Sequence, residues 1–170
     1  MASLKSIRKR ISTVKSTQQI TKAMKMVAAA KLRRAQEAAQ EARPYAEKLA
    51  AMLQTVAARS ADSGHPLLAE RASEARIDLI LVTSDRGLCG GYNAGLIRKA
   101  EQFIAEHPGS TVRLTVVGNK GYMHFRRRPV GVAEQHVQLP GGPDLALALQ
   151  LSARVARDYI AEQTDGVYVL

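Results

Sequence analysis

This chain of 170 residues has one cysteine, no tryptophan and few aromatic side chains. A single cysteine, Cys89, excludes an internal disulfide framework. Aromatic residues make up only 4% of the chain, which argues against the base-stacking platforms of proteins that bind single-stranded nucleic acid. No apolar run approaches the roughly 20 residues that a membrane-spanning helix needs, so we expect no direct membrane span.

Acidic residues are absent from the first 36 positions, which carry ten lysines and arginines. Through Ser60 the chain has thirteen basic and three acidic residues, a surplus that accounts for the whole net charge of +10. A charged segment beside a neutral remainder indicates an element that binds another molecule. An import signal is an alternative, because this segment is basic and rich in Ser and Thr. However, the pattern continues past Ala30 with no small-residue break where processing would occur.

Apolar residues recur along this segment at steps of three and four, which is the period of a helix. The segment also lacks glycine, Ser3 is a plausible N-cap, and Pro44 is the one breaker, where a kink or a break would fall. A narrow seam of this kind is typical of a coiled coil, not of a helix that lies on a globular core. We therefore predict a shaft helix over residues 1–60 that needs a partner helix. The seam consists of Leu4, Ile7, Ile11 and Val14, passes Thr17, Gln18 and Thr21, resumes beside them with Ile20 and Val27, and continues to Val56.

Strand and helix patterns alternate in the second part of the chain, after a linker predicted over residues 61–75. Strands are predicted at 76–84, 111–117 and 167–170, with a weaker one at 130–137. Helices are predicted at 94–106 and 144–163, the second capped by Asp144, with a helical turn at 121–125. This order predicts an α/β fold over residues 76–170, a Rossmann-like parallel sheet in three α/β/α layers. The domain is expected to be truncated, because the sequence stops inside its last strand.

Residues 85–93 follow a strand and precede a helix, where open α/β sheets bind ligands. The loop lacks the G-x-G-x-x-G spacing and the Gly-Lys-Ser/Thr of a phosphate-binding loop, so a tight turn or a protein-contact loop is favoured. Cys89 has no base partner that the sequence marks out, and no carboxylates form an acid/base pair. The histidines lack metal-ligand spacing, and three arginines at 126–128 are expected to be solvated. We predict no catalytic residue, no metal and no cofactor. The histidines are His65, His107, His124 and His136.

Two segments resemble one known family. Residues 4–11 (LKSIRKRI) and 17–35 (TQQITKAMKMVAAAKLRRA) are similar to the N-terminal helix of the gamma subunit of F-type ATP synthases. Residues 84–93 (SDRGLCGGYN) resemble the loop after the first strand of that family, and residues 43–46 and 166–169 match as well. The resemblance covers the whole chain in order.

The resemblance implies that the N-terminal helix winds against a long C-terminal helix as an antiparallel coiled coil, the central shaft inside a ring of alpha and beta subunits. Rotation of this shaft couples proton flow to ATP synthesis or hydrolysis at the beta subunits, while the globular domain contacts the epsilon subunit and the membrane c-ring. The subunit itself would be non-catalytic and peripheral on the inner face of an energy-transducing membrane, here the cytoplasmic side of a bacterial plasma membrane. Carried over, the residues that would contact acidic loops of the beta subunits are Lys22, Met24, Lys25, Met26, Arg86, Leu88 and Cys89.

The family continues through more sheet to a C-terminal helix that this sequence does not contain, so we interpret the chain as an N-terminal part of such a subunit. Two alternatives stay open. One is a basic nucleic-acid-binding helix on an α/β domain, which a pI near 10.1 allows. The basic residues circle the helix instead of lining one face, which argues against it. The other is a small-molecule enzyme that uses the glycine-rich loop.

Overall fold

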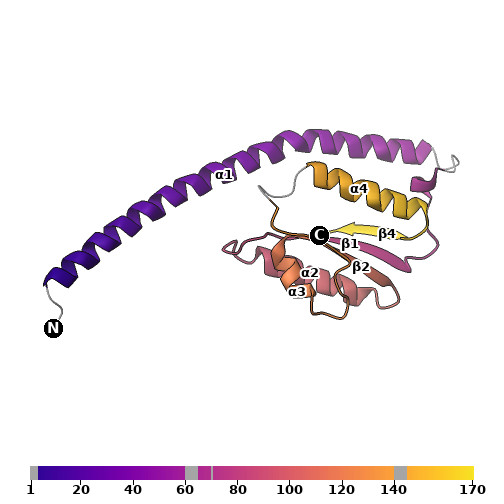
Figure 1. Cartoon of the computed structure of the whole chain (residues 1–170). Helices are drawn as coiled ribbons and strands as arrows, with labels where there is room; N and C mark the ends of the chain where they lie inside the picture. Colours follow the sequence, from indigo (N-terminus) through magenta and orange to yellow (C-terminus); the bar gives the residue numbers. More distant parts are fainter. Residues whose placement is uncertain (1–3, 60–64, 70, 140–144) are drawn as a thin grey trace. The chain divides into compact units, whose positions relative to one another are not determined.

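The computed structural model describes residues 4–59, 65–69, 71–139 and 145–170, and the chain divides into two compact units, Met1–Asp62 and Ser63–Leu170. The described residues of the first unit form one helix, α1 (Leu4–Arg59), which is drawn in indigo to magenta in Figure 1. With 56 residues, α1 is roughly 84 Å long at about 1.5 Å per residue. The predicted caps Ser3 and Asp144 lie outside the described residues.

Helix α1 runs through Pro44 as one element, so a break at this position is excluded. Proline removes one backbone hydrogen bond and costs about 3 kcal/mol in a helix interior. The residues around it are mostly Ala, Glu, Lys, Leu and Arg, which are strong helix formers. Their propensity, summed over many turns, maintains the helix across the proline.

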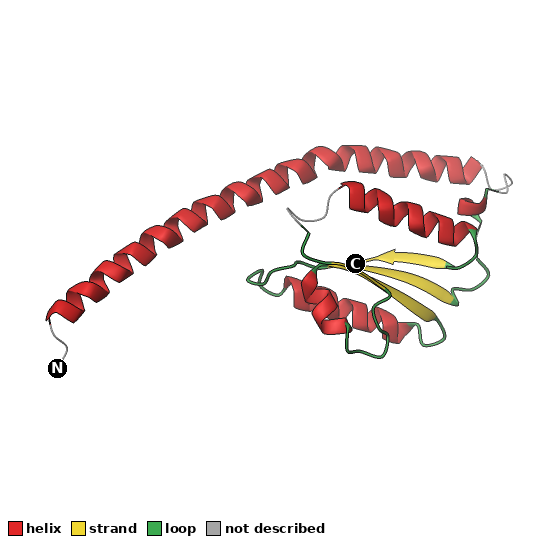
Figure 2. Cartoon of the chain, in the orientation of Figure 1, coloured by secondary structure: helices red, strands yellow, loops and turns green. Residues whose placement is uncertain are grey.

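The second unit is a four-stranded parallel sheet with helices on both faces, as predicted (Figure 2). The strand order is β3-β2-β1-β4. Helices α2 and α3 cover one face and α4 covers the other. The bounds are β1 (Arg76–Val82), α2 (Tyr92–Glu106), β2 (Thr111–Val117), α3 (Asn119–Phe125), β3 (Glu134–His136), α4 (Leu145–Ile160) and β4 (Gly166–Val169), with a short 3-10 helix η1 (Pro66–Leu68) before β1.

The core lies on both sides of β1 and β2, because successive side chains of a strand point to opposite faces. Leu79 and Leu81 pack with Leu114 and Val116 on the side of α2 and α3. Ile80 and Val117 pack on the side of α4, against Leu147 and Leu151. A parallel sheet buried on both faces explains why both strands read as nearly continuous apolar runs.

A layer of charged side chains is buried between the sheet and α4, and the sequence analysis did not predict it. Arg113 of β2 forms ion pairs with the fully buried Asp78 of β1 and, at 2.5 Å, with Asp158 of α4. Arg154 of α4 contacts the same two carboxylates at 3.4 and 3.5 Å and also lies 3.0 Å from Glu134. Burial favours the neutral form of Asp158, but its bond to Arg113 and the nearby arginines outweigh this and lower its pKa.

Strand β3 is shorter than predicted, covering Glu134–His136 instead of 130–137. The chain turns at Gly131, whose φ is 64°, and reaches β2 at Ala133, whose N–H donates to the carbonyl of Leu114 at 2.9 Å. Val130 and Val132 pack against the core on the α2 and α3 side instead. The apolar side chains at these two positions therefore reflect packing against the core and do not indicate a strand.

Candidate functional site

The apolar seam of α1 is exposed along the whole helix, whose residues are all described and none of which is buried. The exposed fraction of the large apolar residues of the predicted seam ranges from 42% at Leu49 to 78% at Leu4. Exposed apolar surface of this extent marks an interaction site. The predicted seam residues Leu4, Ile7, Ile11, Val14, Ile20 and Val27 are all exposed, and so are Leu49, Leu53 and Val56 further along.

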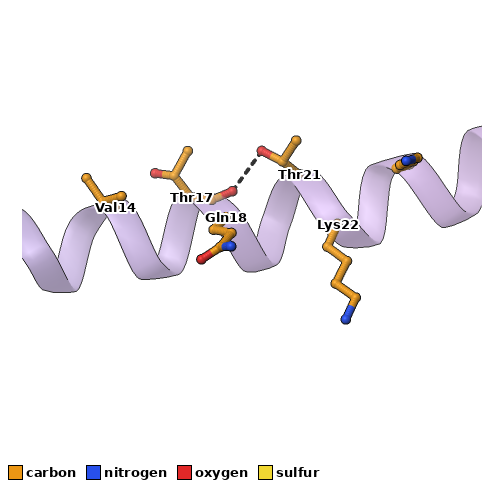
Figure 3. Close-up of a pocket in the computed structure, with 6 residues that line it drawn as sticks. Val14, Thr17, Gln18, Thr21 and Lys22 are labelled. Atoms are coloured by element: carbon orange, nitrogen blue, oxygen red, sulfur yellow. Dashed lines mark hydrogen bonds between the residues drawn. The ribbon is translucent and has the colours of Figure 1, made fainter.

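The gap in the seam at Thr17 and Thr21 is filled by methyl groups. The hydroxyl of Thr17 donates to the carbonyl of Thr13 at 2.9 Å, and that of Thr21 donates to the carbonyl of Thr17 at 2.8 Å. Figure 3 shows the methyl groups of both threonines along the same edge of the helix as Val14, and Gln18 and Lys22 line the same shallow hollow along the other edge. The hydroxyls are satisfied by the backbone, so this stretch presents carbon atoms to a partner.

The predicted contact residues on α1 lie in the stretch without acidic residues. Met24 and Met26 are exposed by 66% and 61%. Within the part of the chain that the structure describes, neither Lys22 nor Lys25 forms an ion pair, and both line a shallow hollow with Val14 and Thr17 (Figure 3). Flexible, unpaired ammonium groups beside polarizable thioethers suit an acidic partner surface.

The loop between β1 and α2 is fastened at its two ends by Asn93, the second residue of α2. The side-chain oxygen of Asn93 accepts from the backbone N–H of Ser84 at 3.0 Å. Its amide nitrogen donates to the hydroxyl of Ser84 at 2.9 Å and to the thiol sulfur of Cys89 at 3.0 Å. One carboxamide therefore joins the start of the loop to a residue near its end.

Asp85 holds the base of the same loop. Its carboxylate accepts from the backbone N–H groups of Asn119 at 2.8 Å, and of Gln138 and Leu139 at 3.1 Å each. Burial favours the neutral acid, but these three bonds and the charge of Arg86 outweigh it, so the pKa of Asp85 is lowered. The carboxylate occupies the N-terminus of α3 and accepts the N–H of Asn119 there, so it joins the loop after β1 to the loops after β2 and β3.

Leu88 stands at the tip of the loop with a relative exposure of 110%, so its side chain is fully exposed among the residues that the structure describes. Its φ of 65° is in the left-handed region, which costs a residue with a side chain about 1–2 kcal/mol. Arg86 and Cys89 beside it are exposed as well. The three predicted contact residues of this loop thus lie together, whereas the other four lie on α1.

In the described part of the chain, no three His, Cys, Asp or Glu side chains are grouped so that they could hold a metal ion. His124 lies 2.8 Å from Glu101, and His136 lies 2.9 Å from Glu134. His65 caps η1 through its ring nitrogen. These histidines have local structural partners. Likewise, no helix within the described ranges is both long and apolar enough to cross a bilayer.

The structure thus combines a long helix that exposes an apolar seam with a separate Rossmann-like α/β domain. The family model described as ATP synthase matches residues 3–170, and the chain belongs to this family. It is 48% identical to the ATP synthase gamma chain of Geobacter sp. (strain M21) over an alignment that covers all of this chain and 59% of that relative. It is 47% identical to the ATP synthase gamma chain of Desulfitobacterium hafniense, again over all of this chain and 60% of the relative.

The chain thus spans about three fifths of the length of these curated relatives. A solved structure of the central stalk and c-ring of the Tetrahymena thermophila mitochondrial ATP synthase matches with a TM-score of 0.63 and 24% identity. That match covers 82% of this chain and 59% of the other, and it shows the likeness of fold. The resemblance to gamma subunits is confirmed, and the alternative of a nucleic-acid-binding helix has no support from the family or from these relatives.

Proposed function

We propose that this chain is part of the central rotor subunit of a rotary ATP synthase, in which α1 is one strand of an antiparallel coiled-coil shaft. The observation that carries the proposal is a 56-residue helix with no buried residue and an apolar seam along its length. A helix of this length cannot bury its seam alone, and most helical stability in proteins comes from packing of the apolar face. The seam therefore requires a second helix.

The basic stretch of α1 is proposed to meet acidic loops of the beta subunits, through Lys22, Met24, Lys25 and Met26. Long-range attraction guides a basic shaft into an acidic ring. The absence of carboxylates from the first 36 residues leaves these lysines without competing partners nearby on the helix. We further propose that Arg86, Leu88 and Cys89 contact the same loops from the globular domain.

The globular domain is proposed to couple the shaft to the epsilon subunit and the c-ring. In this proposal residues 1–60 form the shaft helix, 61–75 the linker and 76–170 the domain. The subunit performs no chemistry itself, since ATP is bound and hydrolysed by other chains. The complex lies on the inner face of an energy-transducing membrane, and the bacterial sources of the reported relatives favour the cytoplasmic side of a bacterial plasma membrane.

Binding to an alpha/beta ring, measured beside binding to duplex DNA, tests the proposal. The full chain should be retained by the ring and not by DNA at the same ionic strength. Retention by DNA alone would refute it. Salt weakens both kinds of complex and does not separate them.

Charge variants test the assignment of the contact residues. Replacing Lys22 and Lys25 together by glutamine should slow association with the ring about tenfold at low salt, with the difference fading as salt is added. Arg43→Gln with Lys48→Gln, which removes two charges from the same helix at exposed sites outside the predicted contact, is the matched control. Equal slowing by the control would mean that only net charge matters, and that Lys22 and Lys25 do not form a specific contact.

A further inference from the structure

The tip of the β1–α2 loop is held in a strained conformation that its own residues do not explain. Leu88 adopts a φ of 65°, and its side chain is fully exposed within the described part of the chain. A residue stays in such a conformation only where its surroundings determine it. The hydrogen bonds at the two ends of the loop are the available cause.

Asn93 supplies the bonds that lie closest to the tip. Its carboxamide bonds the backbone N–H and the hydroxyl of Ser84, four residues before Leu88, and the sulfur of Cys89, the residue after it. The backbone N–H of Tyr92 also donates to the carbonyl of Cys89 at 3.4 Å. Asp85, Arg86, Gly87 and Leu88 lie between these two fastened points. The carboxylate of Asp85 is bonded to three backbone N–H groups, and the carbonyl of Arg86 accepts from the hydroxyl of Ser84 at 2.5 Å.

We propose that Asn93 is a positioning residue for protein recognition: its carboxamide holds Leu88 outward as a preorganised apolar contact without touching the partner itself. The inference rests on the proposed function, in which this loop meets the alpha/beta ring. A partner surface that accepts the tip has an apolar pocket for Leu88 and a carboxylate within reach of Arg86. Fixing the loop before binding removes an ordering cost that a mobile loop would incur on binding.

A double-mutant cycle between Asn93 and Leu88 tests the inference, with affinity for the alpha/beta ring as the readout and the full chain as the ligand. Leu88→Ala should weaken binding about tenfold, because it removes most of a buried leucine side chain from the interface. Asn93→Ala should weaken binding about fivefold. The double variant should bind no more weakly than Leu88→Ala alone, because Asn93 acts through Leu88. Gln150→Ala, at an exposed amide on α4, is the control and should bind like the unaltered chain.

Amide hydrogen exchange distinguishes positioning from general destabilisation. In Asn93→Ala the N–H groups of Ser84 and Tyr92 should exchange faster, while those within β1 and β2 keep their protection. If Asn93→Ala does not fold, Asn93→Asp takes its place in the binding assay. It keeps an oxygen acceptor for the N–H of Ser84 but loses the donor to Cys89, and should weaken binding as Asn93→Ala does.

The outcomes separate the inference from the proposed function. If the unaltered chain does not bind the ring, the proposed function fails. If Leu88→Ala weakens binding while both Asn93 variants bind normally, the proposed function stands and the positioning role is overturned. Additive losses in the double variant would also overturn it, because Asn93 would then act independently of Leu88.

Discussion

Replacing Arg113 by methionine perturbs the charged layer between the sheet and α4. Arg113 pairs with Asp78, which is fully buried, and with Asp158. Breaking a buried ion pair by removing one partner typically costs about 3–5 kcal/mol, because a charge is left uncompensated. Arg113 is about one third exposed and Arg154 still lies 3.4 Å from Asp78, so we expect the low end, about 3 kcal/mol.

Amide hydrogen exchange measures this loss of unfolding free energy for the second unit alone, because the amides of its strands exchange when that unit unfolds. A loss of about 3 kcal/mol corresponds to roughly a hundredfold faster exchange of the slowest amides of β1 and β2. The double variant Asp78→Asn with Arg113→Met should recover part of the stability, because the buried charge is removed together with its partner. Arg98→Met, at an exposed arginine on α2, is the control and should change stability by less than about 0.5 kcal/mol.

A loss below about 1 kcal/mol for Arg113→Met would refute the reasoning. It would mean that Asp78 reaches water or is compensated by Arg154 alone. Failure of the double variant to recover any stability would show that the cost lies in packing of the arginine stem and not in the charge.

Three further predictions concern the backbone and the loops. Gly118→Ala should destabilise the second unit by more than about 2 kcal/mol in a urea titration, because φ is 97° and a Cβ would lie 2.1 Å from the carbonyl oxygen of Thr83. The control Gly95→Ala, with open space around the added Cβ, should be neutral or stabilising in that titration. The pKa of Asp85 is lowered in the folded state, so its contribution is present above its unfolded pKa of about 4 and disappears as pH falls through the folded value. Asp85→Asn should therefore flatten the loss of stability below about pH 4, and an unchanged acid profile would contradict the assignment. Pro44→Ala should raise the temperature at which α1 loses its helix, followed by circular dichroism, because it restores a backbone hydrogen bond inside α1; an unchanged melting temperature would mean that the proline imposes no cost there.

Much of the fold could be predicted because its signals are local. The absence of glycine and the three- and four-residue apolar steps predicted α1, and the alternation of apolar runs with helical patterns predicted a parallel sheet. Strand β2 was predicted with its observed bounds. Strand β3 was predicted too long, because Val130 and Val132 are apolar for packing against the core and not for pairing with β2.

The candidate site, too, could be predicted from the sequence only in part. Leu88 and Arg86 could be singled out by resemblance, but no pattern showed that Leu88 is wholly exposed or that Asn93 joins both ends of its loop. The partners of Asp85 could not be predicted, since Gln138 and Leu139 are more than fifty residues away along the chain. Only the parallel sheet brings the ends of β1, β2 and β3 to one edge.

The sequence by itself determined the basic, glycine-free helix with its apolar seam, because charge, propensity and period are properties of neighbouring residues. It also determined the family through the motifs of that helix and of the loop after β1. The tertiary structure alone decided the buried layer of Asp78, Arg113, Arg154 and Asp158, and the use of Asp85 to join three loops. Such contacts depend on strand register and on which helix covers which face, and these arise from packing of residues far apart in the chain.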